Sequence, residues 1–209
     1  MNCPLCQSSE YVLFDQDKKR SYFKCSDCTL VFVPREQILS AADESNRYEA
    51  HQNSEDDPYY KKYLTDIAQE TLPFLHTKSF GLDFGCGKTK LLASIYEERG
   101  IQMDSFDLYF HPDESIWKKT YDFIILSEVI EHLAAPRETM ESLNSLLKAG
   151  GEFFIKTKFC PESSEDFSKW FYKRDMTHVE FFNEKSMETL AQKLGKSFQK
   201  IGNDLYRLT

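Results

Sequence analysis

Four cysteines near the N-terminus have the residue type and the spacing of a metal site. Cys3 and Cys6 form one C-x-x-C pair, and Cys25 and Cys28 form a second pair after 18 intervening residues. Each pair can direct two thiolates at one tetrahedral ion, and four thiolates complete the coordination of a structural Zn²⁺. Two disulfides are the alternative, which a reducing cytoplasm disfavours. We therefore expect a zinc ribbon with short strands between and after the pairs.

A glycine-containing loop follows an apolar run at residues 79–84. Its letters GKT at 87–89 suggest the end of a phosphate-binding loop, GxxxxGK[ST]. That pattern requires glycine at position 82, which is Leu82. The dinucleotide pattern GxGxxG also fails, because its third position is Lys90. The loop therefore predicts neither a nucleotide hydrolase nor a dinucleotide site.

Acidic residues and histidines that could bind a ligand or move a proton follow later apolar segments. Asp107 lies in FDLYF, about 20 residues after the glycine loop. Glu128, Glu131 and His132 follow YDFIILS at offsets that share one face, if the turn there is helical. His178 lies in a later loop. Such groups suit removal of a proton from a nucleophile.

Alternating strand and helix patterns supply the elements that must position these residues. Short apolar runs predict strands, and apolar residues three and four apart predict helices. The order predicts an α/β fold with a Rossmann-like, doubly wound, mostly parallel sheet and a C-terminal antiparallel hairpin. A further helix begins near Pro58. The expected strands are 79–84, 102–110, 121–127 and 151–157, the expected helices are 89–99, 137–148 and 183–194, and the hairpin is 196–209.

Three motifs resemble class I S-adenosylmethionine-dependent methyltransferases. LDFGCG is similar to the first motif of the family, FDLYF ends in the expected acid, and YDFIILSEVIEH is similar to a later strand and turn. The resemblance implies that Asp83 binds the methionine ammonium and that Asp107 binds the ribose hydroxyls. The free N–H groups of the following helix would bind the methionine carboxylate. The implied cofactor-binding residues are Asp83, Gly85, Cys86, Gly87, Asp107, Leu108 and Ser127.

One departure from the family concerns the segment after Asp107. Thirteen residues, 108–120, separate it from the next strand, where the family has a helix, an edge strand and another helix. We therefore expect this edge strand to be missing, because the central pairings of the sheet do not need it. Phe110, His111 or Trp117 would then close the adenine pocket.

Three roles are open for the residues that follow YDFIILS. EVIEH with a later histidine resembles the small-RNA 2′-O-methyltransferases and the ubiquinone-pathway O-methyltransferases, which implies a divalent metal near the acceptor hydroxyl. His132 acting as a direct base is the second role. The third is structural, because EVIEH also occurs in relatives that need no metal. The candidate catalytic or metal-binding residues are Glu128, Glu131, His132 and His178.

The segment 158–182 is rich in aromatic and charged residues and is long for a loop. It contains WFYKRDMTHVEFF, which resembles a subgroup with an N-terminal zinc ribbon. Its aromatic residues either wall an acceptor site or pack against residues 35–57 as core. These residues are Phe159, Trp170, Phe171 and Tyr172.

Composition limits the partners of this 209-residue chain. Its 34 acidic and 26 basic residues leave a net charge of −8. Nucleic-acid binding needs a basic stripe, so we expect no nucleic-acid partner. No stretch approaches the roughly 20 apolar residues of a spanning helix, and the first residues lack the features of a secretory signal. We expect a cytoplasmic protein that does not bind membranes.

Three regions follow from these patterns: a zinc ribbon at 1–34, a linker or arm at 35–57, and a methyltransferase domain at 58–209. The expected reaction is methyl transfer from S-adenosylmethionine to a small-molecule or sugar-type acceptor. The alternative is a degenerate domain that binds the cofactor without turnover, while the ribbon docks a protein partner.

Overall fold

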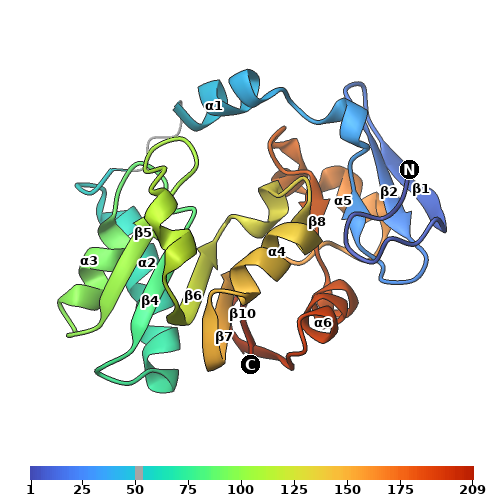
Figure 1. Cartoon of the computed structure of the whole chain (residues 1–209). Coiled ribbons are helices and arrows are strands. Elements are labelled where there is room, and N and C mark those ends of the chain that lie inside the picture. Colours follow the sequence, from blue (N-terminus) through green and yellow to red (C-terminus); the bar gives the residue numbers. More distant parts are fainter. Residues whose placement is uncertain (50–53) are drawn as a thin grey trace. The chain divides into compact units, whose positions relative to one another are not determined.

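The computed structural model describes residues 1–49 and 54–209, which form two compact units (Figure 1). The ribbon unit comprises Met1–Glu49, Ile130–Ser142 and Thr157–Phe198, and the sheet unit comprises residues 54–129, 143–156 and 199–209. Residues 50–53 of the predicted linker lie outside the described residues. The domain boundaries drawn after residues 34 and 57 stay a prediction.

A six-stranded sheet organises the sheet unit, in the order β5-β4-β6-β7-β10-β9. Four strands are parallel, and the C-terminal hairpin adds β10 antiparallel to β7. Almost every residue of β6 is buried, as expected for a central parallel strand. The predicted fold class is confirmed. The strands are β4 (Phe80–Phe84), β5 (Gln102–Phe106), β6 (Tyr121–Ser127), β7 (Leu147–Lys156), β9 (Phe198–Gly202) and β10 (Leu205–Leu208).

Two α-helices pack on this sheet. α2 (Pro58–Thr71) begins at the predicted proline, where the Asp57 carboxylate accepts a hydrogen bond from the N–H of Tyr59 at 2.9 Å. α3 (Leu91–Glu97) begins two residues later than predicted, so the loop keeps residues 88–90. The two helices share a core with β6 and β7. Two 3-10 helices complete the unit, η2 (Leu72–Phe74) and η3 (Glu114–Lys118).

The sheet ends at β5, so the predicted loss of an edge strand after Asp107 is confirmed. The strand expected at 102–110 stops at Phe106, because the chain turns at Asp107. Asp107 and His111 exchange backbone hydrogen bonds of 3.1 and 3.0 Å across this turn. Between Asp107 and β6, the chain forms one short helical element, η3.

A second sheet, in the order β1-β2-β3-β8, organises the ribbon unit. Its first three strands lie where the sequence predicts them, and every pairing is antiparallel. The fourth strand was not predicted, because its partner β3 lies far away in the sequence. The strands are β1 (Tyr11–Gln16), β2 (Ser21–Cys25), β3 (Val31–Phe32) and β8 (Glu180–Phe181). The helical elements are η1 (Arg35–Gln37), α1 (Ala41–Glu49), η4 (Ile130–His132), α4 (Pro136–Asn144), α5 (Ser164–Lys169), η5 (Phe171–Arg174) and α6 (Glu184–Lys193).

The ribbon strands share one hydrophobic core with the segment 157–182. The Phe167 ring packs edge-on against Tyr22 and Phe181, with centroid distances of 5.1 and 5.2 Å. A ribbon of about 35 residues cannot bury a sufficient core by itself. The later segment therefore contributes apolar surface as well as one strand. The cluster contains Tyr22, Val31, Val33, Cys160, Phe167, Tyr172, Val179 and Phe181.

Candidate functional site

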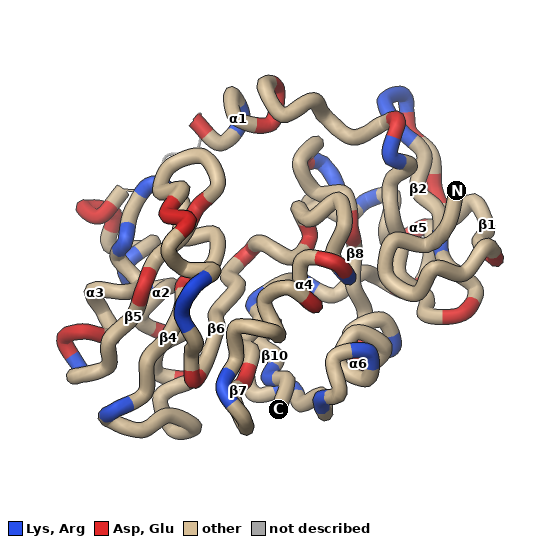
Figure 2. The backbone as a smooth tube through the Cα atoms, viewed as in Figure 1, with Lys and Arg blue, Asp and Glu red and all other residues tan. Residues whose placement is uncertain are grey.

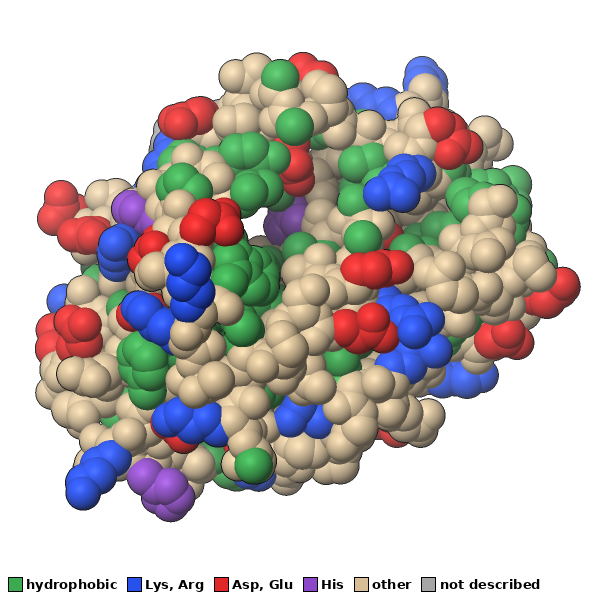
Figure 3. Space-filling view, viewed as in Figure 1, with side chains coloured by type: hydrophobic (Ala, Val, Ile, Leu, Met, Phe, Trp, Pro, Cys, Tyr) green, Lys and Arg blue, Asp and Glu red, His purple; other side chains and the backbone are tan. Residues whose placement is uncertain are grey.

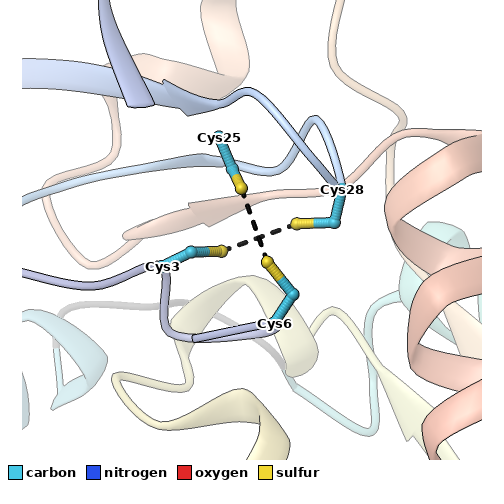
Figure 4. A group of neighbouring side chains, drawn as sticks. All are labelled: Cys3, Cys6, Cys25 and Cys28. Atoms are coloured by element: carbon cyan, nitrogen blue, oxygen red, sulfur yellow. Dashed lines mark hydrogen bonds between the residues drawn. The ribbon is translucent and has the colours of Figure 1, made fainter. Parts of the chain in front are cut away.

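The four N-terminal cysteines converge from two loops (Figure 4). The Sγ atoms of Cys3 and Cys28 lie 3.5 Å apart, as do those of Cys6 and Cys25. A tetrahedral zinc with Zn–S bonds of about 2.3 Å separates its sulfur atoms by about 3.8 Å. All four thiols are free. The cluster therefore fits a structural zinc ion, and no disulfide joins its members.

Each cysteine pair lies in a tight turn that aims both thiols inward. The residue after each pair, Gln7 or Thr29, has a positive φ of 67° or 61°. Their N–H groups donate to the carbonyls of Cys3 and Cys25, at 2.9 and 3.1 Å. The contact between the Cys3 and Cys28 sulfur atoms lowers the pKa of Cys3 and raises that of Cys28.

The glycine loop leaves β4 through two residues with positive φ, Gly85 at 83° and Gly87 at 68°. A Cβ atom at Gly85 would lie 2.4 Å from Cγ2 of Val129, so only glycine fits. A Cβ atom at Gly87 would meet nothing within 4 Å. The loop is thus tight on one side and open on the other. Its open side can accept a ligand.

Asp107 is hydrogen-bonded to this loop. Its Oδ2 accepts a hydrogen bond from the N–H of Gly87 at 3.0 Å. Its Oδ1 accepts from Tyr109 and Phe110, at 2.9 and 3.1 Å. The carboxylate therefore orders both the glycine loop and the turn after β5. Oδ1 thus uses both of its acceptor sites, whereas Oδ2 keeps one.

Asp83 is the buried acid of the site, with only 3% of its surface exposed. Burial raises the pKa of its carboxyl group to about 7, and the nearby Asp107 carboxylate adds to the rise. A cationic ligand would reverse this effect. The pair therefore suits a ligand that carries an ammonium group beside hydroxyl groups.

The residues near the end of β5 leave aromatic and aliphatic surface open. Leu108 is 66% exposed, and Trp117 is 38% exposed. The Trp117 ring packs edge-on against Phe84 and Phe106, at 6.4 and 6.2 Å. His111 contacts the carbonyl of Lys88 through Nε2 at 3.1 Å, so it braces the loop. Leu108 and Trp117 therefore present apolar surface to solvent near the end of β5.

Ser127 and Glu128 end β6 in the sheet unit. The Ser127 hydroxyl lies 3.0 Å from the hydroxyl of Tyr63, which also donates to Glu128 at 3.5 Å. Glu128 has a positive φ of 53°. The expectation that Glu128, Glu131 and His132 share one helical face is therefore wrong, because the 3-10 turn η4 begins only at Ile130. Tyr63 was not predicted as part of the site.

Glu131, His132 and His178 lie together in the ribbon unit. One possible ligand atom from each lies within 4.8 Å of the others. The imidazole rings are 4.6 Å apart between centroids. Glu131 is fully buried and accepts a hydrogen bond from the Tyr172 hydroxyl. These three residues can hold a metal ion or act on a proton.

Backbone carbonyls orient both histidines in the same way. Nδ1 of His178 donates to the carbonyl of Tyr172 at 2.7 Å, and Nδ1 of His132 donates to that of Thr177 at 3.1 Å. A carbonyl can only accept, so each Nδ1 carries the proton. In the neutral ring, each Nε2 then has a lone pair, which suits a base or a metal ligand.

The aromatic residues of 158–182 take different environments. Tyr172 is buried against His178, with a ring distance of 4.1 Å, and Trp170 packs on the core of the ribbon unit. Phe159 stacks on Phe198, whereas Phe171 is 58% exposed. Trp170 and Tyr172 thus pack as core, and the role of these aromatic residues in walling an acceptor site stays a prediction. Of the arm, Ile38 packs on the same core.

A cavity of about 670 Å³ lies within the ribbon unit, and no predicted site residue lines it. It lies beside the first cysteine pair, at Pro4 and Gln7, and beside Glu138 of α4. Glu180 in its wall is 1% exposed, and burial raises the pKa of its carboxyl group. The sequence carries no periodic signal for this cavity, because its lining comes from distant segments.

The parallel sheet, the glycine loop after β4 and the acid after β5 define the architecture of an S-adenosylmethionine-dependent methyltransferase. A family model described as a methyltransferase domain matches residues 57–197. The chain therefore belongs to this family of methyltransferases. No curated protein matches the sequence.

Solved structures share the fold at low sequence identity. The 1,6-didemethyltoxoflavin-N1-methyltransferase of Burkholderia thailandensis, with bound 1,6-didemethyltoxoflavin and S-adenosylhomocysteine, is 14% identical with a TM-score of 0.55, and the match covers 96% of this chain and 97% of that one. An O-methyltransferase family protein from Burkholderia thailandensis is 13% identical with a TM-score of 0.50, covering 79% and 61%. A methyltransferase of calicheamicin biosynthesis is 12% identical with a TM-score of 0.48; the match covers 71% of this chain and 54% of that one, so this chain spans about half of its length.

No helix in residues 1–49 and 54–209 is both long enough and apolar enough to cross a membrane.

Proposed function

We propose that this chain transfers a methyl group from S-adenosylmethionine to a small-molecule or sugar-type acceptor. The observation that carries the proposal is the hydrogen bond between the Gly87 N–H and the Asp107 carboxylate, beside buried Asp83. The net charge of −8 disfavours a long polyanionic acceptor. The didemethyltoxoflavin enzyme, which shares the fold over nearly its whole length, has a small molecule bound.

The sheet unit would bind the cofactor through the predicted residues. Asp83 would bind the methionine ammonium, and the methionine carboxylate would lie on the open side of the loop formed by Cys86 and Gly87. Asp107 would bind ribose hydroxyls, and Leu108 would lie against adenine. Ser127 would border the site at the end of β6. When bound, the cofactor supplies a methyl group already activated on a sulfonium, so these residues mainly position it.

The candidate residues for proton chemistry lie in the ribbon unit. His132 and His178 each carry an Nε2 lone pair in the neutral ring, which suits removal of a proton from a hydroxyl group. Glu131, held by Tyr172, would stabilise the imidazolium that forms. Glu128 is the remaining candidate, held by Tyr63 at the end of β6.

Cofactor binding is tested by a thermal shift with S-adenosylhomocysteine. A ligand at 100 times its dissociation constant adds about 2.7 kcal/mol to the free energy of unfolding, so Tm should rise by several degrees. Absence of a shift at millimolar ligand would sink the proposal. Turnover is then measured as S-adenosylhomocysteine release with a panel of hydroxylated small molecules and sugars.

A divalent metal at Glu131, His132 and His178 is a second role for the same residues. The grouping of their ligand atoms within 4.8 Å and the Nδ1 hydrogen bonds to carbonyls both support it. A bound ion would lower the pKa of an acceptor hydroxyl. Cobalt(II) added to zinc-loaded protein should give d–d absorption without thiolate charge transfer, and His178→Ala should abolish it.

A binding module without turnover is the competing function. The short segment after Asp107 and the 66% exposure of Leu108 favour it, because both leave the adenine side less enclosed. It would show the thermal shift with S-adenosylhomocysteine and no methyl transfer to any acceptor. The ribbon would then serve a protein partner.

A further inference from the structure

Arg20 is a buried cation that lies just before β2 in the ribbon. Its exposed fraction is 2%. A guanidinium has five N–H donors, and each of them has an acceptor here. Nε donates to the Tyr22 hydroxyl at 2.9 Å, and the other four donors reach backbone carbonyls. A charge removed from water in this way stays buried only because its donors are all satisfied.

The four carbonyls belong to one short segment, residues 173–178. Nη1 donates to Met176 and His178, at 3.0 and 2.8 Å. Nη2 donates to Lys173 and Asp175, both at 2.7 Å. The segment is more than 150 residues away in sequence, so a single side chain from the ribbon fixes its backbone.

The same segment holds both histidines of the site. The carbonyl of Thr177, which orients the His132 ring, lies between the two residues that Nη1 binds. The carbonyl of Tyr172, which orients the His178 ring, directly precedes the first residue that Nη2 binds. Each of these ring orientations therefore depends on a backbone conformation that Arg20 stabilises.

The ribbon ties this segment to the proposed zinc site through one strand. β2 begins directly after Arg20 and ends at the proposed zinc ligand Cys25. Lys173 adds an ion pair with Asp15 of β1, with an N–O distance of 2.5 Å and side chains that are 7% and 10% exposed. Loss of the zinc ion should therefore loosen β2 at both ends, at Cys25 and next to Arg20.

We propose that Arg20 is a positioning residue: its planar fork of donors sets the tautomer and orientation of His178 and His132. The ribbon is then an integral part of the site that carries the proton chemistry. That His178 and His132 act in catalysis rests on the proposed function; their orientation by Arg20 does not.

The test is nitrogen NMR of the histidine side chains in the full, zinc-loaded chain. In the wild type, the His178 and His132 rings should each show protonated Nδ1 and unprotonated Nε2. In Arg20→Gln, the carbonyls lose their donors and the rings should become mixtures that include the Nε2–H form. Arg20→Lys keeps the charge without the fork, so it should show the same mixtures.

Arg47→Gln is the matched control. Arg47 contacts the same segment through the Asp175 side chain, at 3.3 Å, rather than through the backbone carbonyls. It should leave both ring signals unchanged. Each variant is first checked for zinc content, and Arg20→Lys, which keeps volume and charge, keeps the test open if Arg20→Gln does not fold.

Unchanged ring signals in a folded Arg20 variant would overturn the proposal, as would an equal effect of Arg47→Gln. Wild-type signals in Arg20→Lys would overturn the role of the fork. The thermal shift with S-adenosylhomocysteine is measured on the same samples. A further outcome is that the Arg20 variants change the ring signals as expected while S-adenosylhomocysteine gives no thermal shift in the wild type. That result would reject the proposed function and leave the positioning role of Arg20 intact.

Discussion

The buried carboxylate of Asp83 destabilises the folded, ligand-free protein, and a cationic ligand can remove this destabilisation. Burial raises the pKa of its carboxyl group from an ordinary value near 3.8 to about 7. A carboxyl group with a raised pKa favours the folded state at low pH, and this contribution is lost as pH rises from about 4 to about 7. At pH 8 the folded protein therefore bears a buried, uncompensated charge.

Asp83→Asn should consequently stabilise the ligand-free protein at pH 8 while weakening the ligand. We expect the free energy of unfolding to rise by on the order of 1–3 kcal/mol. We expect the affinity for S-adenosylhomocysteine, measured by calorimetry, to fall tenfold or more. Wild-type affinity should increase from pH 6 to pH 8, and the affinity of the variant should not. Asp66→Asn, at a half-exposed position of α2, is the control. Equal ligand affinity in Asp83→Asn and wild type would contradict the role of Asp83.

The two glycines of the loop should respond differently to alanine. Gly85→Ala forces a Cβ atom to 2.4 Å from Val129 at a positive φ, which should cost about 3 kcal/mol of stability. Gly87→Ala meets no neighbour and should cost about 1 kcal/mol, the strain of its φ. Gly87→Ala should instead weaken S-adenosylhomocysteine binding, since its methyl group enters the open side of the loop.

Denaturant unfolding and calorimetry on both variants separate these effects. The double variant Gly85→Ala, Val129→Ala should recover part of the lost stability, because it removes the Val129 methyl groups that the new Cβ atom would meet. A larger loss of stability in Gly87→Ala than in Gly85→Ala would contradict the geometry of the loop.

At the scale of elements, β8 couples the cysteine ribbon to the segment that carries His178. β8 pairs with β3, with Val31 opposite Phe181, and the N–H of Val33 donates to the carbonyl of Val179 at 2.9 Å. β3 directly follows the second cysteine pair. Order in β8 therefore depends on the order of the ribbon.

Removal of zinc should loosen β8 together with the ribbon strands. Four thiolates would hold the ion, so acid or a strong chelator should release it by protonating or outcompeting them. Hydrogen exchange should then accelerate at 21–33 and 179–181, while β4 and β6 of the sheet unit stay protected. Zinc analysis of chelator-free protein should give one ion per chain. Retained protection of 179–181 after loss of the ion would contradict this coupling.

At the scale of the whole molecule, charge sets the class of partner. Acidic and basic residues are both spread over the two units, and on the face drawn in Figure 3 basic side chains lie among acidic ones (Figures 2 and 3). With a net charge of −8, association with a polyanion releases few counterions and meets long-range repulsion.

The chain should therefore bind nucleic acid weakly at physiological salt. Fluorescence anisotropy with a labelled RNA oligonucleotide and a labelled duplex should give dissociation constants above about 10⁻⁴ M at 0.15 M salt, weaker than typical nonspecific binding. Binding in the micromolar range, with an affinity that falls as salt rises, would contradict this and would reopen RNA as the acceptor.

The sequence by itself determined the features that depend on local spacing. The C-x-x-C pairs, the strand before Asp83 and Gly85, and the acid about 20 residues later each follow from short-range geometry. The thirteen-residue segment after Asp107 also predicted the missing edge strand, because chain length limits what a segment can form. The tertiary structure alone decided which distant segments meet. β8 pairs with the ribbon strand β3, and Arg20 donates to carbonyls in 173–178. Neither contact follows from the sequence, because a buried donor bonds to any acceptor that the fold brings near, irrespective of sequence distance.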